Sequence, residues 1–210
     1  AAADVNHTFT FGDGGFFNST LGVSYQEKTN RAKKMMLWFG IISLIMSFAG
    51  LTSAVIVSSS RPDWSEDLTL PSVFIVSVII IVLSSITFIL AKRAVKKGNN
   101  EIASAFLLVT LGLGCAFIYT QFAGFRQLIE SGYYLTGPTS DPKASYIFLI
   151  AFVHILHVAV GLICLIVVIY NHFKQKYTPT NMLGLELAGT FWHFIDILWV
   201  YLFLFLYFFM

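Results

Sequence analysis

The sequence predicts an all-α membrane protein, a polytopic bundle of five transmembrane helices. Of its 210 residues, 57% are hydrophobic and only 11% are charged, whereas soluble domains carry roughly 25% charged residues. Five apolar runs each reach the length of about 20 residues that a membrane-spanning helix needs. They are too long and continuous for barrel strands, which alternate in pieces of about 10 residues. This composition excludes a water-soluble globule and a disordered chain, and a net charge of +2 gives no sign of nucleic-acid binding.

The five predicted spans cover residues 35–57, 71–91, 102–125, 144–170 and 186–210. They form one transmembrane domain, residues 35–210. Pro71 suits the first turn of the second span, because a helix start needs no backbone N–H there. Residues 1–34 alternate Phe with Gly, as at Phe9, Phe11 and Gly12. We expect them to form an irregular arm at the cytoplasmic surface or a loosely ordered tail, without a cleavable signal peptide.

The basic residues predict the orientation of the bundle. The chain has 13 Lys and Arg residues. Ten lie before the first span or between spans two and three or four and five: Lys28, Arg31, Lys33, Lys34, Lys92, Arg93, Lys96, Lys97, Lys174 and Lys176. The other three, Arg61, Arg126 and Lys143, lie on the opposite side. Since cytoplasmic loops are enriched in Lys and Arg, we expect a cytoplasmic N-terminus and a periplasmic C-terminus.

The two cysteines, Cys115 and Cys164, both lie inside apolar runs. This position disfavours a disulfide framework. We expect both to act as small buried hydrophobic side chains.

Five ionisable side chains lie within the last two spans: His154, His157, Glu186, His193 and Asp196. Such groups are costly in a bilayer and are functional candidates by default. The two histidines of span four are three residues apart and share a helix face. Glu186 and His193 are seven apart and stack along one stripe of span five, with Asp196 beside it. We expect these five side chains to form a structural polar cluster.

Depth along the helices suggests how this cluster is paired. Counted from the cytoplasmic ends, Asp196 and His157 lie at similar heights, so we expect them to pair directly or through water. His193 lies about 9 Å closer to the cytoplasm than His157, which is a poor geometry for haem ligation. Three interpretations remain: a hydrogen-bonded lock between helices, a metal site of His154, His157 and Asp196, and a proton relay.

Small and aromatic residues predict close packing between the spans. Gly112, Gly114 and Gly161 permit close helix approach. Trp192 and Trp199 are seven residues apart and share a face. They lie too deep to be interfacial anchors only, so we expect both to be buried against a partner with each indole N–H bonded to an acceptor.

Two motifs on successive spans resemble a known family. Span four has His154, His157 and Gly161, in the pattern H-x-x-H-x-x-x-G, and span five has the pattern E-x-A-x-x-x-W-H-F-x-D-x-x-W. The second pattern is carried by Glu186, Ala188, Trp192, His193, Phe194, Asp196 and Trp199. Together they resemble the signature of subunit III of the haem–copper oxidases, the cytochrome c oxidases and their quinol-oxidising relatives. Gln121 and Gly114 add a weaker likeness in span three, and the resemblance covers about residues 31–210.

The resemblance implies a non-catalytic accessory subunit of a proton-pumping terminal oxidase in the bacterial inner membrane. Such a subunit holds no haem or copper and packs mainly against subunit I, which does. Subunit II, further small subunits or a supercomplex are other implied partners, with phospholipid bound between helices. The family is thought to support proton uptake near subunit I and to protect its active centre. Gly161, Trp192, Phe194, Trp199 and Gln121 would then serve packing, lipid contact or subunit contact.

The chain also departs from the family pattern. Leu44 and Gly124 stand where the family commonly has glutamates, and Leu90 and Ala91 stand where it has a pair of histidines. Five spans resemble the shorter bacterial form. The main alternative is a small membrane b-type cytochrome or quinone-site protein, with His154 or His157 and His193 as ligands. A transporter is a third hypothesis, although no internal repeat supports it.

Overall fold

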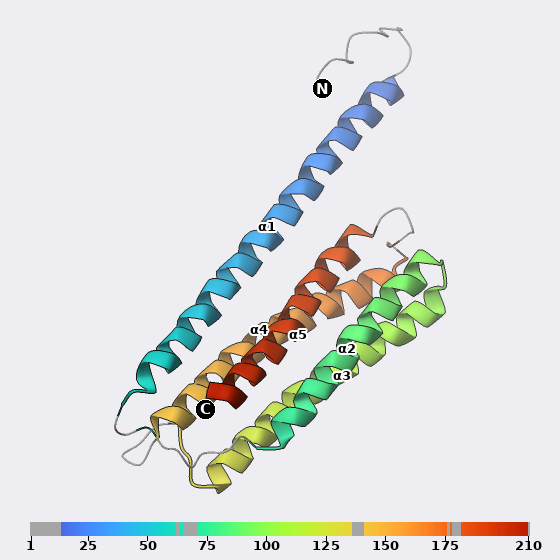
Figure 1. The fold of residues 1–210 in the computed structure, drawn as a ribbon. Helices are drawn as coiled ribbons and strands as arrows, with labels where there is room; N and C mark the ends of the chain where they lie inside the picture. Colours follow the sequence, from blue (N-terminus) through green and yellow to red (C-terminus); the bar gives the residue numbers. More distant parts are fainter. Residues whose placement is uncertain are drawn as a thin grey trace. The chain divides into compact units, whose positions relative to one another are not determined.

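The computed structural model describes residues 14–61, 64, 71–135, 141–175, 177 and 182–209, with side chains from residue 27 onward. Over these residues the chain forms five helices: α1 (Gly14–Ser58), α2 (Val73–Lys96), α3 (Asn100–Glu130), α4 (Pro142–Phe173) and α5 (Leu183–Phe209) (Figure 1). Each contains a segment long and apolar enough to cross a membrane. The predicted all-α, five-span fold is therefore confirmed.

At most of their ends the helices extend beyond the predicted spans, because backbone hydrogen bonds continue into the polar turns. The start of α2 is an exception: the helix begins at Val73 with Ser72 as its N-cap, so Pro71 precedes the helix and does not lie in its first turn as predicted. At the start of α4, Asp141 caps the helix by accepting a hydrogen bond of 2.9 Å from the Lys143 backbone N–H, with Pro142 in the first turn. The largest difference is at the N-terminus, where α1 already begins at Gly14. The expectation of an irregular arm is wrong for residues 14–34, while Phe9, Phe11 and Gly12 lie outside the described residues.

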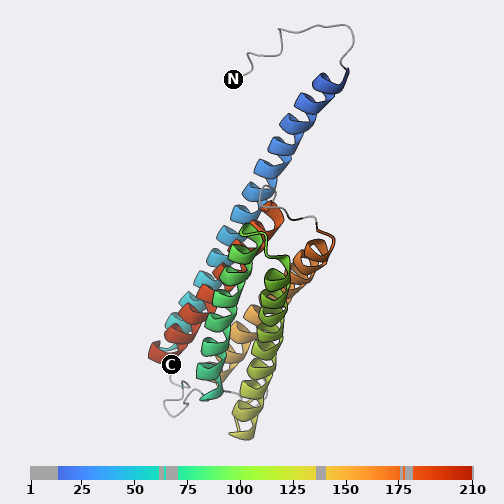
Figure 2. The same cartoon turned by 90° about the vertical axis from the view of Figure 1, so that its right-hand side faces the viewer.

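The chain divides into two compact units, Ala1–Phe39 and Gly40–Met210. In the second unit α2 packs against α3 and α5, and α4 packs against the same two helices, so that the four helices close a ring. Figures 1 and 2 show these four helices running alongside one another. The part of α1 in this unit contacts α4: the Phe48 ring meets His154 and His157, and Ser58 Oγ shares a 2.7 Å hydrogen bond with Tyr146 Oη.

Two polar contacts close the end of the bundle where α3 begins and α4 ends. The buried His172 donates from Nε2 to the Asn100 carbonyl at 3.2 Å and also contacts Ser104 Oγ at 3.1 Å. In the connection from α4 to α5, partial burial raises the pKa of Tyr177, and a hydrogen bond with Asn171 opposes this rise. His172 was not among the expected polar residues, because it lies beyond the predicted end of span four.

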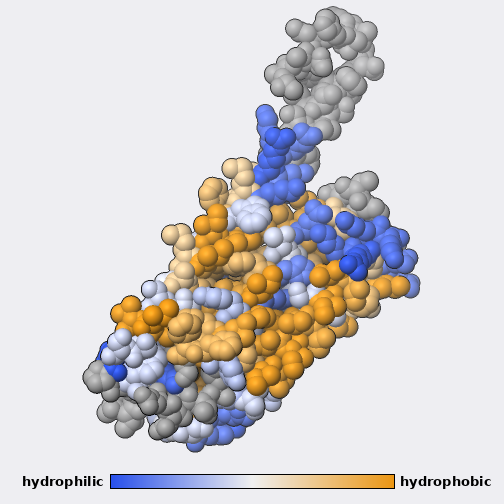
Figure 3. All heavy atoms as spheres, in the orientation of Figure 1, coloured by the Kyte–Doolittle hydropathy of each residue, from blue (hydrophilic) through white to orange (hydrophobic). Residues whose placement is uncertain are grey.

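The surface of the second unit is apolar along much of its length. Six large aliphatic side chains on α2 and α4 are 48–61% exposed: Ile79, Leu83, Ile86, Leu156, Ile163 and Ile166. Figure 3 shows apolar residues over the middle of the visible face and hydrophilic residues toward the ends. A surface of this kind suits hydrocarbon rather than water.

The expectation that both cysteines are buried is wrong. Cys115 and Cys164 are free, as expected, but both are exposed on the outer surface of the bundle rather than buried. An apolar run in a membrane protein has a lipid-facing side as well as a packed one, so hydrophobic neighbours do not indicate burial.

Trp192 fills a hollow that two glycines open between α3 and α4. A Cβ atom on Gly114 would lie 2.7 Å from Leu162 Cδ2 and 2.9 Å from Trp192 Cη2, and a Cβ on Gly161 would lie 3.2 Å from the same indole. Gly112, one of the three expected packing glycines, has nothing within 4 Å of its Cβ position. Gly114 and Gly161 therefore make room for Trp192, and Gly112 does not.

We expect Gly114→Val to lower the free energy of unfolding of the detergent-solubilised protein by about 1–3 kcal/mol, because the added methyl groups overpack the Trp192 site. Gly112→Val is the matched control, since it makes the same change of residue on the same helix in open space. Denaturant titration of both variants measures the difference. Equal losses for the two variants would contradict this packing.

Candidate functional site

A line of polar side chains, here called the polar seam, joins α2 and α5 inside the bundle. It consists of Ser77, Ser84, Ser85 and Lys92 on α2 and Trp199, Trp192, His193 and Glu186 on α5. These residues form four pairs across the two helices: Ser77–Trp199, Ser84–Trp192, Ser85–His193 and Lys92–Glu186. The first two pairs are seven residues apart on each helix, and so are the last two, so each kind of pair recurs after nearly two turns.

The deeper row of the seam consists of two serine–tryptophan hydrogen bonds. Trp192 Nε1 donates to Ser84 Oγ at 3.0 Å, and Trp199 Nε1 donates to Ser77 Oγ at 3.1 Å. Ser77 Oγ in turn donates to the Phe74 carbonyl at 2.7 Å, which leaves its lone pairs free to accept. Both indoles are buried, and an unpaired N–H in a bilayer interior costs several kcal/mol, on the order of the cost of any buried unpaired amide. Each indole thus has the acceptor that we expected, on a neighbouring helix of the same chain.

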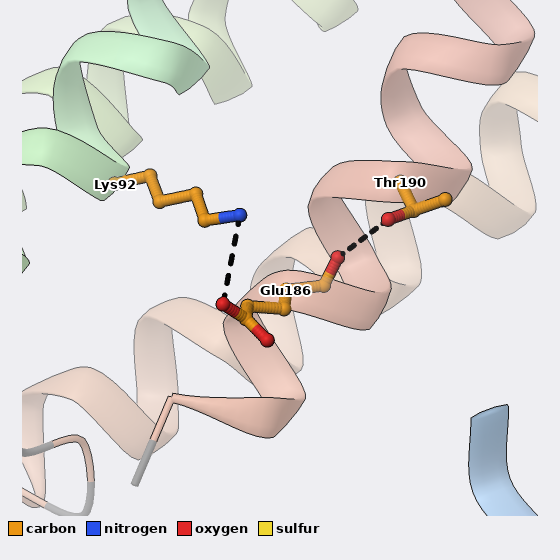
Figure 4. A network of polar contacts seen from close by, with 3 residues as sticks. All are labelled: Lys92, Glu186 and Thr190. Atoms are coloured by element: carbon orange, nitrogen blue, oxygen red, sulfur yellow. Dashed lines mark hydrogen bonds and ion pairs between the residues drawn. The ribbon is translucent and has the colours of Figure 1, made fainter. Parts of the chain in front are cut away.

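The second row of the seam is half-buried. Ser85 Oγ and His193 Nδ1 share a hydrogen bond of 2.5 Å, and the Phe88 ring packs edge-on against His193 at 5.6 Å. Nearer the helix ends, Lys92 Nζ lies 3.8 Å from Glu186 Oε1, with the two side chains 35% and 42% exposed. Figure 4 shows this pair, together with the hydrogen bond from Thr190 Oγ1 to the Glu186 carbonyl. An exposed pair of this kind contributes at most about 1 kcal/mol.

Gly189 brings α2 and α5 close enough for these contacts. A Cβ on Gly189 would lie 2.7 Å from Phe88 Cε1, so a larger residue would push the helices apart. The serines of α2 were not predicted as acceptors, because a serine hydroxyl in a helix can bond a carbonyl of its own helix instead, as Ser77 does to Phe74. Their signal was present, since the spacing of Ser77 and Ser84 equals that of Trp192 and Trp199.

On α4, aromatic rings surround His154. It is fully buried, with its ring stacked on Trp199 at a centroid distance of 4.8 Å. The Phe48 and Phe117 rings contact it edge-on at 6.2 Å and 5.9 Å. Neither ring nitrogen has a hydrogen-bond partner. A haem does not fit against this ring, since three aromatic side chains already occupy its surroundings.

The predicted pair of Asp196 with His157 is not formed directly. His157 Nδ1 donates instead to the Val153 carbonyl of its own helix at 2.7 Å. Asp196 is buried, and its side chain interacts with Ser85 of α2 rather than with α4. Depth along a helix gives the height of a side chain but not its direction around the axis, and α5 turns Asp196 toward α2.

Of the other residues singled out in the sequence, three are buried or half-buried in the bundle: Gln121, Phe194 and Gly124. Gln121 is fully buried on α3, and neither of its amide atoms has a partner; Asp196 Oδ2 has none either. Phe194 is half-buried against the hydrophobic core. Gly124 lies against the Phe74 ring, which would be 3.1 Å from an added Cβ, so a glutamate there would require the Phe74 ring to move.

The structure does not bring together the residues of the metal site that was one of the three interpretations. Over the described part of the chain, no three His, Cys, Asp or Glu side chains are placed so that they could hold a metal ion. His154, His157 and Asp196 were the candidate set, and Asp196 faces a different helix. The expected single cluster of five polar residues is thus divided between the α2–α5 seam and the aromatic surroundings of α4.

We expect His154→Leu to change the free energy of unfolding by less than about 1.5 kcal/mol, because it removes two unpartnered nitrogens at nearly constant volume. Trp199→Ala, next to it, should cost about 3–5 kcal/mol, since it removes a large buried ring and the bond to Ser77. Denaturant unfolding in detergent measures both variants. A loss of similar size for both would show that His154 has a polar partner.

Comparison with known proteins identifies the family of this chain. Residues 18–210 match the family model "Cytochrome c oxidase subunit III". The chain is 29% identical to cytochrome c oxidase subunit 3 of Alkalihalophilus pseudofirmus, over 81% of this chain and 84% of that protein. It is 32% identical to cytochrome bo(3) ubiquinol oxidase subunit 3 of Pseudomonas aeruginosa, over 79% of each. It is 30% identical to the corresponding subunit of Buchnera aphidicola subsp. Schizaphis graminum, over 86% of this chain and 96% of that protein.

The family model, the similar proteins and the five apolar helices lead to one conclusion. The chain is a multi-pass membrane protein, and the subunits that it resembles are non-catalytic parts of oxidase complexes. It belongs to the cytochrome c oxidase subunit III family, and is subunit III of a cytochrome c or quinol terminal oxidase.

Proposed function

We propose that this subunit stabilises the catalytic subunit I of its oxidase, together with the proton-uptake side of that subunit, and transfers no electrons itself. The observation that carries this proposal is the use made of the buried polar side chains. Ser77 and Ser84 of α2 accept hydrogen bonds from the two indoles of α5, so these buried polar side chains are used to join helices. Hydrogen bonds of this kind between helices fix the packing of a membrane bundle.

The proposed docking surface is the apolar exterior of the bundle. Subunit I is the main partner that we propose, with subunit II and smaller subunits as further neighbours. The oxidases named among the relatives include both cytochrome c and ubiquinol oxidases, so the proposal covers a terminal oxidase of either kind. The surrounding haem and copper chemistry belongs to the partner subunits.

The proposed orientation places the basic end of the bundle in the cytoplasm of a bacterial cell. Lys92, Arg93, Lys96 and Lys97 lie at the end of α2, and Lys174 lies at the end of α4. Lys and Arg concentrate in cytoplasmic loops, which supports a cytoplasmic N-terminus and a periplasmic C-terminus. The inner membrane is the corresponding location.

Lipid binding is the second part of the proposal. A cavity of about 520 Å³ lies between α3 and α4, with walls that include Phe122, Phe125, Ile129 and Phe148. Arg126 also lines it and offers a cation to a lipid phosphate. Its size and apolar walls suit a phospholipid acyl chain.

We expect Trp192→Ala to weaken retention of this subunit in the purified oxidase, because truncating a buried aromatic costs about 3–5 kcal/mol of packing. The initial rate of oxygen reduction should stay close to the wild-type rate, while activity should decline faster during turnover and fewer lipids should remain bound. Native mass spectrometry measures subunit and lipid retention, and an oxygen electrode measures the rates.

Trp192→Phe is the graded control for this experiment, since it keeps a ring between Gly114 and Gly161 and loses only the indole N–H. It should remain in the complex. The proposal would be contradicted if the Trp192→Ala complex kept its full complement of this subunit and still lost most of its initial activity.

A further inference from the structure

We propose that the half-buried row of the polar seam is a proton-exchange path, and that Asp196 is the buried proton-binding site at its inner end. The path would run from the Lys92–Glu186 pair through His193 and Ser85 to Asp196. This goes beyond the proposed structural function, which requires only that the seam hold α2 against α5.

The outer end of the path is open to water. The Lys92 and Glu186 side chains (Figure 4) are 35% and 42% exposed. They lie at the end of the bundle where α2 also carries Arg93, Lys96 and Lys97. His193 follows seven residues further along α5, on the same stripe of the helix. It is half-buried, so its ring lies between the exposed pair and the core.

The inner end of the path is a buried carboxyl group. Ser85 Oγ is bonded to His193 Nδ1, and the Ser85 side chain also interacts with Asp196. Asp196 is only 3% exposed, and its Oδ2 atom has no hydrogen-bond partner. A closed structural lock would use both carboxyl oxygens, whereas here one is left for a proton or a water molecule.

The path has one open end. Beyond Asp196 on α5, Leu198 and Leu202 are buried in the hydrophobic core, and Trp199 is occupied by its bond to Ser77. Among the described residues, the polar contacts of Asp196 therefore lead toward the Lys92–Glu186 end of the bundle.

The ionisable groups around the path are few. Besides Lys92 and Glu186, α4 contributes His154, which is stacked on Trp199, and His157, which is bonded within α4. The ionisable groups described on α3, Glu101, Cys115, Tyr119, Arg126 and Glu130, are exposed. Proton exchange at Asp196 thus depends on His193 and Ser85.

Along this path each group that gains a proton also releases one, until the proton reaches Asp196. His193 takes a proton on Nε2 and releases the proton on Nδ1 to Ser85 Oγ. Ser85 passes its own hydroxyl proton to the Asp196 carboxylate, which becomes a neutral carboxylic acid. Rotation of the hydroxyl and a change of tautomer at His193 restore the path, and the reverse sequence returns the proton. No oxidant, reductant or other reactant is needed.

Two adjacent serines on α2 allow the effect of the proton path to be distinguished from the effect of helix packing by mutation. Ser84 bonds Trp192 in the deeper row, and Ser85 bonds His193 in the path. Ser85→Ala should interrupt proton exchange, whereas Ser84→Ala removes an interhelical bond of the same kind and leaves the path intact. Ser85→Thr keeps a hydroxyl and should restore exchange.

The experiment uses the intact purified oxidase and infrared spectroscopy. The carboxyl C=O band of Asp196 is assigned by its loss in Asp196→Asn, or by its shift in Asp196→Glu where the first variant does not assemble. Transfer from H₂O to D₂O then gives the exchange rate of this carboxyl proton. In Ser85→Ala and His193→Gln we expect exchange to slow by roughly a hundredfold, the low end of what a positioned acid–base group contributes to proton transfer.

Ser84→Ala and Ser85→Thr should exchange at the wild-type rate. A proton path would be excluded by exchange that is equally fast in the wild type, Ser85→Ala and Ser84→Ala. It would also be excluded by a carboxyl band of Asp196 that fails to exchange in the wild-type complex. In either case the half-buried row would be a packing contact only.

Discussion

The indole of Trp192 is the contact on which the rest of the bundle depends. It lies against Gly114 of α3 and Gly161 of α4 and donates its N–H to Ser84 of α2. One side chain of α5 therefore contacts each of the other three helices of the ring. Because the glycines leave room only for a flat ring, and the serine requires a donor at one position, the register of α5 is determined by this residue.

The heptad spacing extends this register along the seam. Two turns further along α5, Trp199 donates the same kind of hydrogen bond to Ser77. Its ring also stacks on His154 of α4. The same spacing pairs His193 with Ser85 and Glu186 with Lys92 on the adjacent row. The same two helices, α2 and α5, thus carry both rows of contacts: the buried tryptophans in the deeper row and the ionisable groups in the half-buried row.

The fold could be predicted largely from the sequence, because a bilayer requires long apolar helices and composition alone reveals them. The family could be predicted too, since the motifs around His157 and Trp192 have fixed spacing. The partner of Asp196 could not, because depth says nothing about direction around the helix axis. The acceptor serines of α2 could not be identified, because hydroxyls can also bond within their own helix. The exposure of Cys115 could not be predicted either, because an apolar run does not distinguish lipid-facing positions from core positions.

The central claim is that the Trp192–Ser84 bond couples α5 to α2. A double-mutant cycle of Trp192→Phe and Ser84→Ala, with unfolding free energies measured in detergent, tests it most directly. Hydrogen bonds between membrane helices contribute about 0.6 kcal/mol on average and up to about 1.7. This account predicts a coupling energy in the upper part of that range, because the indole has no other acceptor. Losses that simply add, with no coupling energy, would contradict it.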